Sequence, residues 1–181
     1  TGVHTVSDPR VLLAPLRLVK DAHEIALMRQ AAAISVAAFE AGAACIAGAE
    51  GEWQVEAALE AAFRSAGATG AAFPSIVAAG SNATVLHYVR NDAPLRSGDL
   101  LLIDAGARYR MYCADISRTY PVNGRFTAEQ RVLYEVVLGA HGAAVGAVRA
   151  GADVTAVEDA AARALVDGMV GAGLLDGTVD G

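Results

Sequence analysis

The chain has 181 residues, of which 54% are hydrophobic, and it carries 14 basic and 20 acidic residues for a formal net charge of −6. This length allows one domain with a sizeable core, while the acidic balance and scattered basic residues exclude a general nucleic-acid-binding role. Neither a secretion signal nor a charge-free membrane-spanning run is evident, so we expect a cytoplasmic protein that binds neither nucleic acid nor membrane.

The first segment of the chain, residues 1–18, contains two prolines and no sustained helical period. We therefore expect residues 1–18 to be a linker from an upstream N-terminal domain. A helix then begins at Asp21, which forms a capping-box pattern with Glu24. Helical spacing predicts that one apolar stripe of this helix faces the core, and it consists of Ile25, Met28, Ala32 and Val36.

A second helix is predicted from Glu52 to Ser65, with a stop signal at Gly67. Its inward residues should be Trp53, Val55, Ala58, Leu59 and Phe63. Short strands and turns follow from Phe73 to Val122, and two more helices should span about 127–148 and 154–175. This order predicts an α+β protein in which helices cover one face of an antiparallel sheet.

Two aspartates, Asp104 and Asp115, carry the clearest chemical signal. Leu100–Ile103 predicts a buried strand, and the segment Tyr112–Val122 predicts its antiparallel partner. A turn at Tyr109–Arg110 would place the two aspartates directly opposite each other, with Cβ atoms about 4.5 to 5.5 Å apart. Like charges at that spacing require a positive partner, which would be divalent metal ions, a basic side chain or a shared proton. Metals fit best because neither strand has a basic residue beside the pair on the same face, and the alternative is a solvated hairpin whose carboxylates splay apart.

The two cysteines, Cys45 and Cys113, are far apart and lack a CxxC spacing, so we expect free thiols in a reducing compartment. Strand alternation places Cys113 on the face of Asp115, where it could approach a metal. The sequence favours a small buried hydrophobe at this position, because free cysteine is commonly a core residue.

Four blocks of sequence carry a family resemblance. They are Leu18-Val19-Lys20 with Glu24-Ile25 and Met28-Arg29; Phe73-Pro74-Ser75-Ile76-Val77 with Asn82 and Leu86-His87-Tyr88; Gly98-Asp99-Leu100 through Ile103-Asp104-Ala105-Gly106; and Asp115-Ile116-Ser117-Arg118-Thr119 followed by Pro121-Val122-Asn123-Gly124. Together they resemble the catalytic domain of the metal-dependent pita-bread peptidases, and within them the Xaa-Pro aminopeptidases (aminopeptidase P) and the related proline dipeptidases. The last two blocks are the most specific, and the segment Pro121–Phe126 favours aminopeptidase P over methionine aminopeptidase.

The resemblance implies a pita-bread (creatinase/aminopeptidase) fold that is incomplete in this chain, with residues 19–181 as the N-terminal portion of the catalytic domain. It also implies two divalent ions, commonly manganese, with cobalt or zinc as alternatives, and five protein ligands. Asp104 would bind one ion and Asp115 would bridge both. The remaining His and two Glu ligands would belong to segments that follow Asp176.

By the same resemblance, His87 would be a catalytic and substrate-binding donor to the scissile carbonyl or the developing oxyanion. Phe73 would contact substrate, at a position near which several aminopeptidase P sequences carry a tyrosine. Ser117 and Thr119 share the face of Asp115 by strand alternation, so their hydroxyls could brace the metal-binding carboxylates.

The expected function is that of a dinuclear-metal hydrolase that removes the N-terminal residue from peptides with proline in second position. The alternatives are an Xaa-Pro dipeptidase (prolidase) or a non-catalytic pita-bread module that binds peptides. An aspartic protease is disfavoured because Ala105 stands where a hydroxyl residue usually follows the aspartate. We expect the chain alone to be inactive, and its partners to be peptide substrates together with a homo-oligomer or a complementing C-terminal chain.

Overall fold

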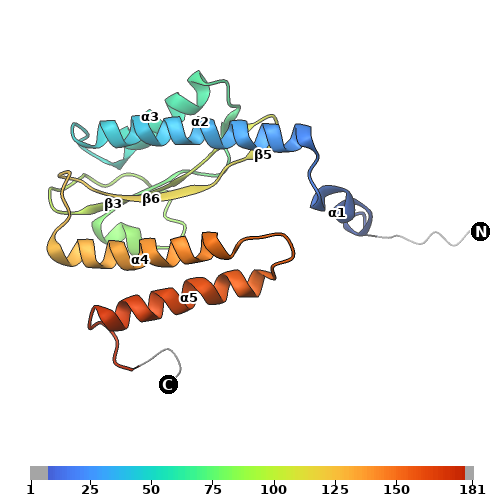
Figure 1. The fold of residues 1–181 in the computed structure, drawn as a ribbon. Helices are drawn as coiled ribbons and strands as arrows, with labels where there is room; N and C mark the ends of the chain where they lie inside the picture. Colours follow the sequence, from blue (N-terminus) through green and yellow to red (C-terminus); the bar gives the residue numbers. More distant parts are fainter. Residues whose placement is uncertain (1–7, 178–181) are drawn as a thin grey trace, which may run out of the picture. The chain divides into compact units, whose positions relative to one another are not determined.

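The computed structural model describes residues 8–177, which form helices and short strands (Figure 1). The chain divides between Gly124 and Arg125 into two compact units. The first unit contains α1 (Arg10–Leu18), α2 (Ala22–Ile46), α3 (Glu52–Ser65), all the strands and a short 3-10 helix, η1 (Gly80–Thr84). The second unit contains α4 (Ala128–Ala147) and α5 (Val154–Gly171).

The segment predicted to be a plain linker forms a helix over most of its described part. Helix α1 follows Pro9 and includes Pro15, and none of its residues is buried. Pro9 precedes the first turn, where a missing N–H has no intrahelical partner, whereas Pro15 lies beyond the first turn and removes one hydrogen bond from the helix. Because of the two prolines, the sequence did not predict this helix. None of its residues is buried, so the helix does not contribute to the core.

Helix α2 begins where the sequence predicted. The Asp21 carboxylate accepts a hydrogen bond from the Glu24 amide, and the Glu24 carboxylate accepts one from the Asp21 amide, both at 2.8 Å. The predicted buried stripe was wrong, because Ile25, Met28, Ala32 and Val36 are all exposed. The buried face consists instead of Ala31, Ile34, Ser35, Ala38, Phe39, Gly42 and Ile46.

Alanine lies on every side of α2, so its apolar pattern offers more than one stripe and packing decides between them. The helix also has the length and hydropathy of a membrane-spanning segment. Its buried face, however, belongs to the same core cluster as α3 and the strands, which is the position of a core helix.

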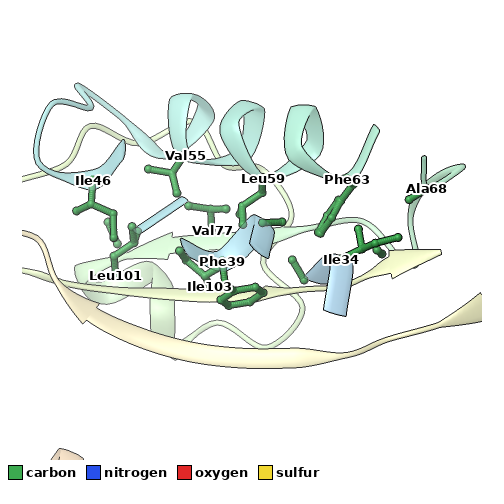
Figure 2. Packing of buried hydrophobic residues seen from close by; sticks show 14 residues of the cluster. Ile34, Phe39, Ile46, Val55, Leu59, Phe63, Ala68, Val77, Leu101 and Ile103 are labelled. Carbon is green, nitrogen blue, oxygen red and sulfur yellow. The ribbon is translucent and has the colours of Figure 1, made fainter. Parts of the chain in front are cut away.

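Helix α3 has the predicted bounds, and its chain leaves at Gly67 with a positive φ of 85°. Val55, Leu59 and Phe63 are fully buried and point toward the strands that carry Val77, Leu101 and Ile103 (Figure 2). Trp53 was wrongly predicted to be inward and is 43% exposed. It lies about 200° around the helix from Val55, since successive residues of a helix are about 100° apart.

The strands form two antiparallel three-stranded sheets, which confirms the α+β prediction. One sheet has the order β2 (Ile76–Ala79), β3 (Leu100–Ala105), β6 (Ile116–Pro121), and the other has the order β1 (Gly70–Ala71), β4 (Ala107–Tyr109), β5 (Tyr112–Cys113). In β3 the side chains alternate, so that Leu101, Ile103 and Ala105 enter the core cluster shared with α2 and α3. Both helices lie on one side of β3 and β6 (Figure 1), and Asp104 faces the other side.

The second unit is a helical hairpin. Helix α4 opens with the predicted capping box between Thr127 and Gln130, and α5 is capped by Asp153 and ends earlier than predicted. A Cβ atom added at Gly168 would lie 2.7 Å from Val136 Cγ1, so this glycine permits the close approach of the two helices.

Candidate active site

Asp104 occupies the centre of the first sheet. It lies on the middle strand β3, paired with Ile76 of β2 on one side and with Ser117 of β6 on the other. Its Oδ1 atom is buried and has no hydrogen-bond partner among the residues that the structure describes. A buried carboxylate oxygen without a partner is rare and indicates a site that requires a cation or another donor.

Asp115 lies diagonally from Asp104 and not directly opposite it. The β3–β6 ladder pairs Asp104 with Ser117, and the β4–β5 ladder continues the same register with Tyr109 opposite Tyr112. The chain therefore turns at Arg110–Met111, one residue later than predicted, and both turn residues have positive φ. Two-residue hairpin turns of this kind match the twist of the flanking strands. The later turn shifts the pairing by two residues. Asp115 therefore stays on the same face of the ribbon as Asp104, but Ser117 takes its place opposite Asp104.

The hairpin bends at Gly106, between β3 and β4. A Cβ atom at Gly106 would collide with the carbonyl oxygen of Ala114, the residue before Asp115. The Gly106 carbonyl accepts a hydrogen bond of 2.7 Å from the Ala72 amide. Glycine is therefore needed after Asp104-Ala105 so that the backbone carrying Asp115 can approach the end of β3.

Both aspartates line one cavity of about 440 Å³, within the first unit of the chain. The other residues that line it are His87 and an apolar set consisting of Phe73, Pro74, Ile76 and Val89. The structure thus brings together four of the predicted site residues, which come from three separate sequence blocks. A cavity with an apolar wall and a few converging polar groups is the usual form of a ligand site.

The pKa of Asp104 is raised from its ordinary value, first because the carboxyl group is partly buried. A hydrogen bond from the Ser117 side chain opposes this shift, while the charge of Asp115 and a hydrogen bond with it raise the pKa further. His87 lies close enough for its charge to favour the ionised form of Asp104. The ionised pair would be stabilised by any positive group placed between the two carboxylates.

The remaining predicted residues differ in outcome. Ser117 lies opposite Asp104 in the ladder, and its side chain acts to lower the pKa of Asp104, whereas Thr119 has no such effect there. Thr119 is paired with Leu102, two residues along the ladder from Asp104. Cys45 and Cys113 are free thiols, as expected, but Cys113 is exposed and not a buried hydrophobe, because β5 is a two-residue strand near the hairpin tip.

Three lining residues were missed as site residues. Pro74 and Ile76 belong to the sequence block of Phe73 that carries the family resemblance. Their closeness to Phe73 in the sequence could have indicated that they line the same cavity. Val89 follows His87 by two residues in an irregular loop, and no sequence pattern distinguishes it.

The class of protein follows from this fold and cavity together with its structural relatives. The chain superimposes on the Pseudomonas aeruginosa aminopeptidase PepP with a TM-score of 0.89 and 43% identity, over 94% of this chain and 39% of that one. A low-pH form of Escherichia coli aminopeptidase P gives a TM-score of 0.92 at 36% identity, over 96% and 39%. The fold is therefore the α+β pita-bread fold of these aminopeptidases, present in part.

The sequence comparisons agree. The model of metallopeptidase family M24 matches residues 26–178, and the chain belongs to this family. The Xaa-Pro aminopeptidase of Haemophilus influenzae is 39% identical over 175 residues, which are 97% of this chain and 41% of that protein. The Escherichia coli Xaa-Pro aminopeptidase is 36% identical over 180 residues, with shares of 99% and 41%. The chain thus spans about two fifths of the length of these relatives.

Membership of a metallopeptidase family implies a divalent metal centre, and the residues of this chain fit one. The buried Oδ1 of Asp104 lacks a partner, Asp115 adds a second carboxylate beside it, and hard oxygen ligands suit divalent cations. No cluster of three or more His, Cys, Asp or Glu side chains suited to a metal occurs among the described residues. Residues 8–177 therefore supply a carboxylate pair and not a closed metal site.

Proposed function

We propose that residues 19–181 form the N-terminal portion of an M24 catalytic domain, and that the complete domain is an Xaa-Pro aminopeptidase. The cavity shared by Asp104, Asp115, His87 and Phe73 is the observation that carries this proposal. It is supported by relatives named Xaa-Pro aminopeptidase at 36–39% identity over nearly the whole chain. The substrates would be peptides with proline in second position.

Asp104 and Asp115 would hold the metal ions, with manganese as our first choice and cobalt or zinc as alternatives. When bound, a pair of divalent ions supplies an activated water at neutral pH. Ser117 would keep the Asp104 carboxylate in position through its hydrogen bond. Thr119 would act in the same way only if its hydroxyl turned toward the pair.

His87 would donate a hydrogen bond to the scissile carbonyl oxygen, where negative charge develops. Its side chain is exposed at the cavity wall, and its backbone φ is 56°. Histidine is among the residues that tolerate this left-handed conformation, and such conformations concentrate at functional sites. A fixed donor at this position would stabilise the transition state more than the ground state.

The apolar wall formed by Phe73, Pro74, Ile76 and Val89 would receive the proline ring and the neighbouring side chain of the substrate. Phe73 cannot provide the hydroxyl that a tyrosine would bring to the metals. Because this hydroxyl is missing, an Xaa-Pro dipeptidase remains our second candidate for the function of the complete domain. We also propose a cytoplasmic location, and either self-association or a complementing C-terminal chain to complete the site.

The test uses the complete domain after chelation, with manganese, cobalt or zinc added back. We expect cleavage of an Xaa-Pro-Xaa tripeptide, and its loss in Asp104→Asn. Asp159→Asn, on α5 and outside the cavity, is the matched control and should remain active. Cleavage of the Xaa-Pro dipeptide alone would identify a dipeptidase, and peptide binding without cleavage would identify a non-catalytic module.

A further inference from the structure

A buried carboxylate, that of Glu52, lies at the start of α3 and is not one of the residues that line the cavity. The Glu52 side chain is completely buried, and none of the ion pairs recorded within residues 8–177 involves it. Its Oε1 accepts hydrogen bonds from the Ala79 amide at 2.7 Å and from Asn82 Nδ2 at 3.1 Å. Its Oε2 accepts from the Tyr88 hydroxyl at 2.8 Å and from the Ala93 amide at 2.9 Å.

These four donors come from two separate segments. Ala79 and Asn82 belong to the end of β2 and to η1, whereas Tyr88 and Ala93 belong to the loop that carries His87. The Tyr88 hydroxyl also accepts a hydrogen bond of 3.0 Å from Asn82 Nδ2, which closes the network. Glu52 therefore connects the first turn of α3 both to the segment before the His87 loop and to the loop itself.

Stability alone is a poor explanation for this arrangement. A buried carboxylate without a cation is costly compared with an apolar residue of similar size, even when neutral donors surround it. Its advantage is geometric, because four directed hydrogen bonds hold the end of β2, η1 and the loop that carries His87 relative to a helix. Asn91 adds a second anchor, with Oδ1 accepting from the Val77 amide at 2.9 Å and Nδ2 donating to the Ser75 carbonyl at 2.8 Å.

The hydrogen bonds of Glu52 and Asn91 surround the loop position of His87. Within the described residues no hydrogen bond is recorded for its ring, and its neighbour Tyr88 is the buried residue that holds the loop. The left-handed backbone of His87 is not a conformation that a free loop would keep. The residue that follows His87 in the chain is thus held by a hydrogen bond to Glu52.

We propose that Glu52 is a positioning residue, which acts through the Tyr88 hydroxyl to hold His87 in its productive orientation. This inference rests on the proposed aminopeptidase function and extends it to a residue outside the cavity. Neither Glu52 nor Tyr88 lines the cavity of Asp104 and Asp115, and the Tyr88 hydroxyl also lies within 3.3 Å of Asp92 Oδ1 in its own loop.

A double-mutant cycle in the complete domain tests the proposal. Tyr88→Phe keeps the buried ring and removes only the hydroxyl, so folding should survive; Tyr134→Phe, in the second unit, is the matched control. We expect Tyr88→Phe to lower kcat by on the order of 10-fold to 10²-fold with little change in KM or bound metal. In a His87→Ala background the same substitution should have no further effect.

Glu52→Gln should give a similar decrease in kcat, because an amide cannot accept from all four donors. Melting temperature and metal content are measured for every variant, so that loss of folding is recognised separately. Equal effects of Tyr88→Phe with and without His87, or an unchanged kcat, would overturn the positioning role. If His87→Ala itself leaves kcat/KM unchanged, the role proposed for His87 fails as well.

Discussion

Ser117 lies directly across the ladder from Asp104, and its side chain acts to lower the pKa of that carboxyl group. This effect favours the ionised form of Asp104 and so opposes the effect of burial on its pKa. Because metal ions bind the ionised carboxylate, Ser117 would contribute to metal affinity at the proposed site without contacting the metal itself.

Ser117→Ala should therefore raise the pKa of Asp104 further and weaken metal binding. We expect manganese affinity of the complete domain to fall by about 10-fold to 100-fold at constant pH. Calorimetric titration measures this change, with Ser97→Ala in an exposed turn as the control. An unchanged affinity would show that the hydrogen bond does not support the metal ligand.

His87→Ala should lower kcat/KM of the complete domain by on the order of 10² to 10³, the usual effect of removing one transition-state donor. The metal content should remain close to that of the unmodified protein, since the imidazole is not expected to be a metal ligand and is only the last of the effects on the pKa of Asp104. Steady-state kinetics together with metal analysis distinguish the two roles. Loss of metal along with activity would make His87 a ligand and contradict the assignment.

The 181-residue chain on its own should bind divalent metal weakly and should not hydrolyse Xaa-Pro peptides. A pair of carboxylates leaves most coordination positions to water, so neither ion has a fixed position. Adding a polypeptide that carries the remaining His and two Glu ligands of the family should restore manganese-dependent cleavage. Robust, chelator-sensitive activity of the chain alone would instead require ligands outside the family pattern.

Tyr88 should give the protein an alkaline stability transition. Burial, followed by the hydrogen bond and charge of Glu52, raises the pKa of Tyr88 to about 12, compared with about 10 in an unfolded chain. The folded state thus holds this proton more tightly, so the stabilisation is complete below pH about 10 and is lost as the pH rises toward 12.

Tyr88→Phe should therefore reduce the decline in the free energy of unfolding between pH about 10 and pH about 12. Urea unfolding at several pH values measures this slope, and Tyr134→Phe serves as the comparison. Identical slopes for the unmodified protein and Tyr88→Phe would mean that the phenol is not held by Glu52.

The two thiols should react at different rates. Cys113 is exposed, whereas Cys45 is only partly accessible and its Sγ lies 3.8 Å from the Gln54 carbonyl oxygen. A thiol reagent should modify Cys113 rapidly in the native protein and Cys45 only slowly, and two thiols should be counted after unfolding without reductant. A count of zero would indicate a disulfide and contradict the reducing compartment that we propose.

Local signals of the sequence were reliable where a single interaction determines the structure. The capping box of Asp21 and Glu24 fixed the start of α2, and the bounds of α3 followed from its period and from Gly67. The face that α2 buries was not predictable in the same way. Alanine on all sides leaves several equivalent stripes, and the choice depends on long-range contacts such as the bond from the Ala107 amide to Ser35 Oγ, at 2.9 Å.

The candidate site was predictable as a set of residues but not as a geometry. The family blocks identified Asp104, Asp115 and His87, whereas the position of the hairpin turn depended on the left-handed conformations of Arg110 and Met111. Neither residue is a usual choice at positive φ, so the sequence gives no warning of it. The Glu52 network was equally hidden, because its members are spread over more than forty residues of chain.

The tip of the hairpin should tolerate inserted residues, whereas the segment near Asp115 should not. Arg110 and Met111 are exposed, and Met111 has 85% of its surface accessible. Extra residues inserted there would enlarge the loop and leave the pairing of Asp104 with Ser117 intact. A single insertion between Cys113 and Ser117 would instead rotate Asp115 to the opposite face of the ribbon. The tip is consequently the place to graft an epitope or a fluorescent reporter, while the base of the same hairpin has a fixed length.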